Sequence, residues 1–127
     1  MPDQTFAGSA VPAATGDALS AEDTKLVTLA RSSRARVGAL EGAAVRDQDG
    51  RTYTAATVAL PRLALTALQL AVASAVAAGA TKLEAAAVVT EAEHLEGAGQ
   101  AAVRDLASDA PIHVAGPDGA LRGSVVA

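Results

Sequence analysis

Apolar residues recur at helical spacing between Ser20 and Arg36, which predicts an amphipathic helix there. Ser20 is a typical N-cap residue, and Asp23 can reach back to it in a capping box. Gly38 is a typical stop signal, because glycine tolerates the left-handed conformation that ends many helices. The preceding segment, residues 1–19, is rich in Ala, Gly, Pro, Ser and Thr without a period, so we expect a disordered tail.

Two segments with strand character follow, residues 43–48 and 51–58, and Asp49-Gly50 separates them. Asp-Gly is a favoured pair for a type I′ turn, in which both central residues take positive φ. The two segments are therefore expected to pair as a β-hairpin.

A nearly continuous apolar run predicts a central helix from Arg62 to Ala78, entered after Pro61 and ended by Gly79. The apolar segment Leu83–Val89 is typical of a strand that is buried on both faces of a sheet. The remaining expected elements are a polar loop at 91–96, a helix at 99–107, a strand at 112–116, a turn at 117–119 and a strand at 121–126.

The resulting order, α-β-β-α-β-α-β-β, predicts an α/β fold with helices on both faces of a mixed five-stranded sheet. Such a three-layer α/β/α sandwich fits one domain at residues 20–127. Half of the residues are apolar, but most of these are Ala, Val and Leu, and Phe6 and Tyr53 are the only aromatics. Small side chains bury little area each, so we expect further burial between subunits of a homodimer or homotetramer.

The net charge of −4 argues against a general nucleic-acid-binding protein. The longest apolar run, Leu63 to Ala78, is shorter than the roughly 20 residues that span a bilayer. No basic flank precedes an apolar stretch at the N-terminus, so we expect a cytoplasmic protein without a membrane segment. The lack of cysteine excludes disulfides and thiolate metal ligands.

Several strings, from about Asp23 to the C-terminus, resemble the cytidine deaminase family. EGAAVRDQDGRTYTA stands where the family has a VGAAL…DG hairpin, and EAAAVV stands where it has a strand of the type AIAVV. LPRLALTAL takes the place of a proline-containing turn into a helix that opens with C-A-E. EGAGQAAVRDL takes the place of the P-C-x-x-C motif at another helix. The resemblance implies the same three-layer fold.

In the family, side chains at two helix N-termini hold a zinc ion that activates water, and a glutamate shuttles the proton. Carried over by position, the resemblance places the first ligand at Thr66, the glutamate at Leu68, and the other two ligands within Gly99–Ala102. The ribose-binding Asn and Glu fall near Thr57 and Ala59, and the phenylalanine before the hairpin becomes Ala39. These residue types cannot ligate zinc strongly, so we expect no zinc and only vestigial catalytic and substrate positions.

Other polar residues could in principle replace the missing site. Glu91, Glu93, His94 and Glu96 form an acidic segment, but neighbours on a loop do not present ligands in a fixed geometry, so we expect a solvated loop. His113 alternates with apolar strand residues and is expected on their opposite face, as a structural or exposed histidine.

Thr66, Gln69 and Ser74 have no base near them in the sequence that could activate a nucleophile. We expect Thr66 to cap or back-bond within its helix, and Gln69 to face a subunit contact.

Three arginines, Arg31, Arg34 and Arg36, form the basic cluster of the sequence. Their place at the end of the first helix is explained by the negative end of the helix dipole. The alternative is a contact with RNA phosphates, which arginine binds in bidentate fashion. The segment Gly97–Gln100 precedes a helix and could hold an anion, although such short motifs are common by chance.

Three functions stay open at this level. The first is a catalytically inactive cytidine deaminase-like protein that acts as an oligomeric binding or regulatory module. The second is a residual zinc-dependent cytidine or nucleoside deaminase with unusual ligation. The third is an accessory factor in RNA or ribosome maturation, an association that the resemblance suggests for cysteine-free, Ala-rich relatives. The protein or RNA partner is not identified by any residue pattern.

Overall fold

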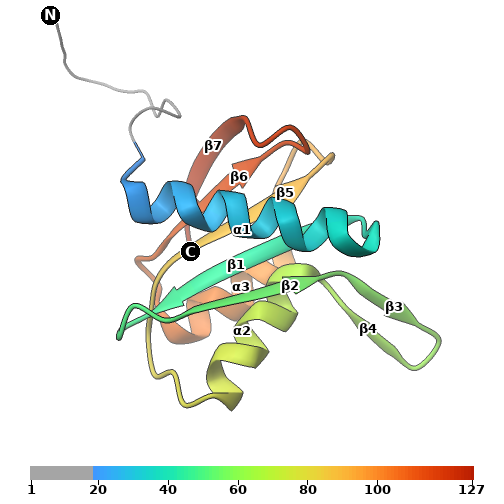
Figure 1. The fold of residues 1–127 in the computed structure, drawn as a ribbon. Coiled ribbons are helices and arrows are strands. Elements are labelled where there is room, and N and C mark those ends of the chain that lie inside the picture. Colours follow the sequence, from blue (N-terminus) through green and yellow to red (C-terminus); the bar gives the residue numbers. More distant parts are fainter. Residues whose placement is uncertain (1–18) are drawn as a thin grey trace, which may run out of the picture.

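A mixed sheet of five strands forms the middle layer of the molecule in the computed structural model, which describes residues 19–127 (Figure 1). In their order across the sheet, the strands are β2 (Thr52–Ala56), β1 (Glu41–Asp47), β5 (Leu83–Thr90), β6 (Pro111–Ala115) and β7 (Leu121–Val126). β5 and β6 pair in parallel, and the other neighbours pair antiparallel. The expected mixed five-stranded sheet is therefore confirmed.

Three helices pack on the two faces of this sheet. α1 (Ala21–Val37) covers one face, and α2 (Ala67–Ala77) and α3 (Gly97–Leu106) cover the other (Figure 1). Alternate strand residues point to opposite faces, so each face has its own apolar core. The strand residues on the α1 side are Ala44, Ala85, Ala87, Val89 and Ala115, and those on the other side are Ala43, Val45, Ala55, Leu83, Ala86, Val88 and Ile112. The three-layer α/β/α sandwich is confirmed.

Helix α1 begins and ends as the sequence predicts. The Oγ of Ser20 accepts a hydrogen bond from the backbone N–H of Asp23 at 3.0 Å, and Gly38 closes the helix with a φ of 64°. The expected capping box is nevertheless wrong in its second half. The carboxylate of Asp23 turns away from the cap and contacts Arg46 and His113. Side-chain partners on the strands that face α1 thus compete successfully with the local backbone.

The β1–β2 turn differs from the expected type I′ turn. Gly50 donates to the carbonyl of Asp47 at 3.1 Å, so Gln48 and Asp49 are the central residues, and Gly50 follows with a φ of 82°. The buried carboxylate of Asp47 accepts from the backbone N–H groups of Asp49 at 2.9 Å and Arg51 at 3.0 Å. These side-chain bonds favour the longer turn.

The second helix begins later than its apolar run predicts. The first part of that run belongs to a separate hairpin, β3 (Val58–Leu60) and β4 (Leu63–Leu65), which projects from the sandwich (Figure 1). Thr66 and Gln69 then form a capping box that fixes the start of α2. The expected start at Arg62 is wrong, because an apolar run by itself does not distinguish a helix from paired strands.

Helix α2 is buried on one face only. Leu68, Ala71 and Ala75 are fully buried against the sheet, whereas Val76 is 49% exposed. The expectation of a helix surrounded by protein on all sides is therefore wrong within one chain. The reason is that α2 lies in an outer layer of the sandwich, where one side faces solvent.

The C-terminal half follows the sequence closely. α3 begins two residues earlier than expected, β6 begins one residue earlier, and β7 has the expected bounds. Residues 1–18 of the expected tail lie outside the described residues, and Leu19 is partly buried against the core under α1. Across residues 19–127, no helix combines the length and the apolar character that crossing a membrane requires.

Candidate functional site

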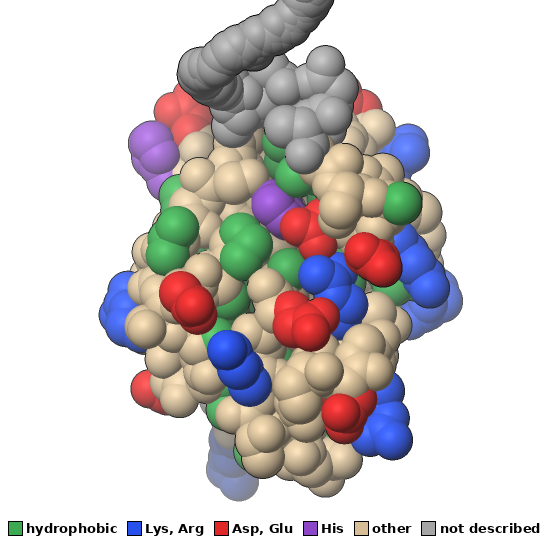
Figure 2. All heavy atoms as spheres, turned by 90° about the vertical axis from the view of Figure 1, so that its left-hand side faces the viewer, with side chains coloured by type: hydrophobic (Ala, Val, Ile, Leu, Met, Phe, Trp, Pro, Cys, Tyr) green, Lys and Arg blue, Asp and Glu red, His purple; other side chains and the backbone are tan. Residues whose placement is uncertain are grey.

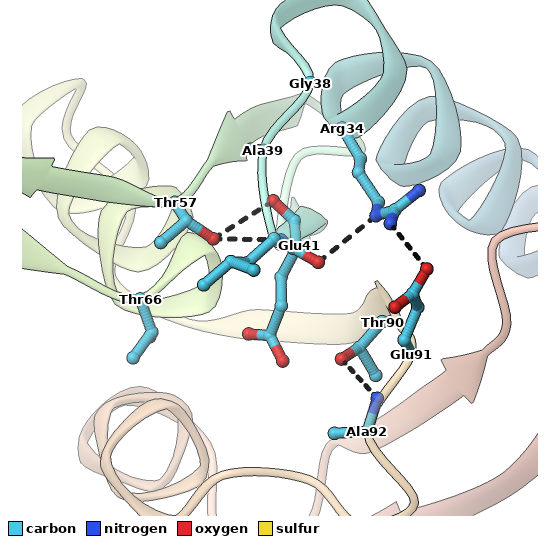
Figure 3. A pocket seen from close by; sticks show the side chains of 10 residues that line it. Arg34, Gly38, Ala39, Glu41, Thr57, Thr66, Thr90, Glu91 and Ala92 are labelled. Carbon is cyan, nitrogen blue, oxygen red and sulfur yellow. Dashed lines mark hydrogen bonds and ion pairs between the residues drawn. The ribbon is translucent and has the colours of Figure 1, made fainter.

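A cavity of about 480 Å³ opens where the end of α1, the start of β1, the end of β5 and the N-terminus of α2 meet (Figure 3). The lining residues that matter below are Arg34, Glu41, Thr57, Thr66, Thr90 and Glu91. A volume of this size suits a small organic molecule. Thr57 and Thr66, two of the vestigial positions, line the cavity, whereas Ala59, Leu68, Gly99 and Ala102 do not.

Thr66 is the N-cap of α2, as expected. Its Oγ1 accepts from the N–H of Gln69 at 3.0 Å, and its own N–H donates to Oε1 of Gln69 at 3.0 Å. The expectation that Gln69 serves a subunit contact is therefore incomplete, because its side chain completes the cap. The structure thus gives Thr66 a local structural role and leaves its hydroxyl neutral and hydrogen-bonded.

Leu68 and Gly99 meet where the first turns of α2 and α3 approach each other. Leu68 is completely buried, and a Cβ added to Gly99 would lie 2.8 Å from its Cβ. Such a Cβ would also overlap Oε2 of Glu96, the N-cap of α3. Oε1 of Glu96 accepts from the N–H of Gly99 at 2.6 Å. A larger side chain at position 99 therefore has no room.

The residues at the carried-over ligand positions do not fit zinc. Such a site needs three or four nitrogen, sulfur or carboxylate ligands. Thr66 offers a hydroxyl that already bonds the backbone, Gly99 has no side chain, and Ala102 packs its methyl group against the core. Glu96 brings one carboxylate, whose Oε2 is buried without a hydrogen-bond partner, but one carboxylate is not a zinc site. Within residues 19–127, no group of three His, Asp or Glu side chains is placed to hold a metal ion.

The vestigial ribose positions behave differently from each other. Thr57 lines the cavity, but its Oγ1 accepts from the N–H of Glu41 at 3.0 Å and donates to the carbonyl of Glu41 at 3.3 Å. Ala59 is an exposed residue of β3 and lines a neighbouring groove between the hairpin and α2. Thr57 also lines that groove, so the two positions share it, and neither presents a free polar side chain to the cavity.

The acidic segment does not converge on one point. Glu91 pairs with Arg34, Glu96 caps α3, and Glu93 and His94 are exposed. The expected solvated loop therefore describes Glu93 and His94, whereas Glu91 and Glu96 have structural partners.

The arginine cluster is partly used inside the protein. Arg31 donates to the carbonyl of Pro117 at 3.1 Å, and Arg34 donates to the carbonyl of Leu40 at 3.1 Å. Arg34 and Arg36 lie in the last turn of α1, as the dipole argument expects. Figure 2 shows basic and acidic side chains interspersed, without a broad basic patch among the described residues of that face. The phosphate contact stays a prediction.

His113 belongs to a polar chain on the α1 face of the sheet. Its Nε2 lies 2.8 Å from Oδ2 of Asp23, and its Nδ1 lies 2.7 Å from Oγ of Ser124 on the next strand. Arg46 continues the chain, with Nη2 2.9 Å from Oδ1 of Asp23 and Nε 2.9 Å from Oε1 of Glu84. Burial raises the pKa of Asp23, but the contacts with His113 and Arg46 outweigh it, so its pKa lies below the ordinary value. His113 is 4% exposed and acts as a structural histidine, on the face that the alternation predicts.

Glu41 is the site residue that the sequence reasoning missed. It is the first residue of β1 and lines the cavity, and Figure 3 shows its carboxylate pointing into it. The signal was a charged residue at the head of the apolar string EGAAV, where the family string VGAAL begins with valine. The strand pattern alone does not show which side chains surround a cavity.

Comparisons with known proteins agree with this architecture. A family model described as cytidine deaminase-like matches residues 19–119. The solved cytidine deaminase from Burkholderia pseudomallei is 23% identical with a TM-score of 0.71, covering 80% of this chain and 90% of that chain. That from Mycobacterium tuberculosis is 23% identical with a TM-score of 0.63, covering 73% and 85%. That from Mycobacterium leprae is 20% identical with a TM-score of 0.61, covering 80% and 90%. At these identities the likeness to the solved structures concerns the fold. No curated protein matches the chain significantly in sequence.

Proposed function

The chain belongs to the cytidine deaminase-like family, and we propose that it serves there as a catalytically inactive, oligomeric binding or regulatory module. The observation that carries the proposal is the environment of Leu68. This side chain is fully buried, and it occupies the position that the resemblance assigns to the proton-shuttling glutamate. A hydrocarbon cannot transfer a proton, and no acid can replace it there without burying an unpaired charge.

The zinc positions support the same proposal. Thr66, Gly99 and Ala102 provide no strong ligand, and Leu68 lies in close contact with Gly99 where the first turns of the two helices approach each other. Zinc affinity depends on anionic or imidazole ligands. The proposal therefore includes the absence of a resident zinc ion.

The oligomeric part of the proposal is supported by exposed apolar residues. Leu60 and Leu63, at the turn of the projecting β3–β4 hairpin, are 60% and 51% exposed, and Val76 on the outer side of α2 is 49% exposed. Apolar side chains on a projecting hairpin and an outer helix face are a suitable surface for a second subunit.

The experiment that tests the inactive function combines metal content with turnover. The untagged full chain is purified without chelator, incubated with zinc, desalted, and analysed for bound zinc and for the conversion of cytidine to uridine. A solved cytidine deaminase such as that from Mycobacterium tuberculosis serves as the positive control. We expect far less than one zinc ion per chain and no turnover above a protein-free blank. Stoichiometric zinc together with turnover would overturn the proposal in favour of the residual deaminase.

A further inference from the structure

Thr57 fixes the backbone of Glu41 beside the cavity. Both the N–H and the carbonyl of Glu41 bond Thr57, with the Thr57 N–H donating to that carbonyl at 3.1 Å. The side chain points into the space between Thr66 and Thr90 (Figure 3). Its carboxylate has no hydrogen-bond or ion-pair partner among the described residues.

The other charges of the cavity compensate each other. Nη2 of Arg34 lies 3.4 Å from Oε2 of Glu91, and Nε of Arg34 donates to the carbonyl of Leu40. Glu41 is therefore the uncompensated charge among the lining residues. A partly buried negative charge favours a cation in its vicinity.

Two hydroxyl groups complete the polar part of the cavity. Oγ1 of Thr66 accepts from the N–H of Gln69, and Oγ1 of Thr90 accepts from the N–H of Ala92 at 3.0 Å. A hydroxyl oxygen has two lone pairs, and each of these oxygens accepts only one backbone N–H, so each can also accept from an N–H donor of a ligand. The methyl and methylene groups of Ala39, Leu40 and Ala92 form an apolar part of the cavity wall.

The chemistry of these groups selects among cations. One free carboxylate is too few for Mg²⁺ or Ca²⁺, which take several oxygen ligands, and a cavity of about 480 Å³ is much larger than an ion. A quaternary ammonium ion is usually bound by aromatic rings, and none lines this cavity. Tyr53, the aromatic residue among the described ones, is on β2 and donates to Asp47 at 2.8 Å.

We infer that the cavity binds a small organic cation with N–H donors, a primary amine or a guanidine, through a salt bridge to Glu41. The inference rests on the proposed non-catalytic function of the same pocket and names its ligand class. The place of Glu41 in the sequence agrees with it, because the family string has an apolar valine there. This chain thus has a carboxylate on β1 where the family string has valine, and Leu68 at the carried-over acid position on α2.

The test is calorimetric titration of the full chain with n-butylamine and agmatine, and with n-butanol as the neutral counterpart of the same shape. We expect both cations to bind, and the alcohol to bind at least about tenfold more weakly, since a charge-assisted hydrogen bond is lost. Glu41→Gln should weaken amine binding about tenfold. The control variant Glu93→Gln makes the same charge change on an exposed loop residue outside the cavity and should leave binding unchanged.

Three results would overturn the inference: no amine binding at millimolar concentration, equal binding of amine and alcohol, or amine binding that survives Glu41→Gln. The inferred ligand class would also be wrong if the wild type bound a divalent metal ion and no amine, and Glu41→Gln lost that metal ion. The ligand would then be a metal. Zinc content and cytidine turnover of the same preparation keep the two proposals apart. An inactive protein that ignores amines removes only the ligand class, whereas an active protein removes the non-catalytic function.

Discussion

Leu68 on α2 lies directly against the backbone of Gly99 on α3, with its Cβ 2.8 Å from the place where a Cβ on Gly99 would stand. The two residues are 31 positions apart in the chain and bring the first turns of the two helices into contact. At the positions that the resemblance assigns to a proton carrier and a metal ligand, the molecule has apolar packing.

A first prediction follows from this contact. Gly99→Ala should lower the free energy of unfolding by about 1–3 kcal/mol, because the new methyl group meets Leu68 and the carboxylate of Glu96. Urea unfolding followed by circular dichroism measures it. Gly97→Ala is the matched control, since its methyl group would meet nothing within 4 Å and alanine favours the helix. Equal stability of the two variants would show that the helices are not packed this closely.

The second prediction concerns the structural role of Thr66. Thr66→Ala should lower the free energy of unfolding by about 1 kcal/mol, because α2 loses its N-cap. Thr66→Ser keeps the hydroxyl and should unfold at nearly the wild-type denaturant concentration. A serine variant as unstable as the alanine variant would mean that the methyl group of Thr66, and not its cap, supplies the stability.

The third prediction is a pH dependence that comes from Asp23. The pKa of Asp23 in the folded state lies below its ordinary value of 3.8, so the ionised form stabilises the fold. This stabilisation is present above the pKa of the unfolded chain and is lost as the pH falls through the lower pKa of the folded state. Asp23→Asn should therefore be less stable than wild type near neutral pH.

The stability difference between wild type and Asp23→Asn should shrink as the pH is lowered below about 4. Urea unfolding of both proteins between about pH 2 and pH 6 provides the comparison. His113, Arg46 and Glu84 are the other charged or titratable members of the same chain, and they are retained in both proteins. A difference that stays constant down to the lowest pH would contradict the assignment.

The fourth prediction tests the surface of the projecting hairpin. If a second subunit covers Leu60 and Leu63, the double variant Leu60→Asp/Leu63→Asp should sediment as a monomer, whereas the wild type should sediment as a dimer or tetramer at micromolar concentration. Val126→Asp, a change of similar exposure on the opposite edge strand, is the control and should keep the wild-type state. A monomeric wild type would remove the oligomeric part of the proposed function.

Much of the fold follows from local patterns in the sequence. The bounds of β7, the Ser20 and Gly38 ends of α1 and the Thr66 cap depend on residues within a few positions of each other. The β3–β4 hairpin was missed because residues 63–65 are as apolar as the helix that follows. The β1–β2 turn type was missed because the carboxylate of Asp47 bonds the turn, which a preference for Asp-Gly does not include.

The sequence by itself determined which residue types stand at the carried-over positions: no cysteine is present, and Thr66 and Leu68 stand where the resemblance assigns a ligand and an acid. Only the tertiary structure decided what occupies that place. The contact of Leu68 with Gly99, the bond between Asp23 and His113 across 90 positions and the direction of Glu41 all join distant segments. Such groups meet only after the strands have paired and the helices have packed, and residue order alone does not specify those distances.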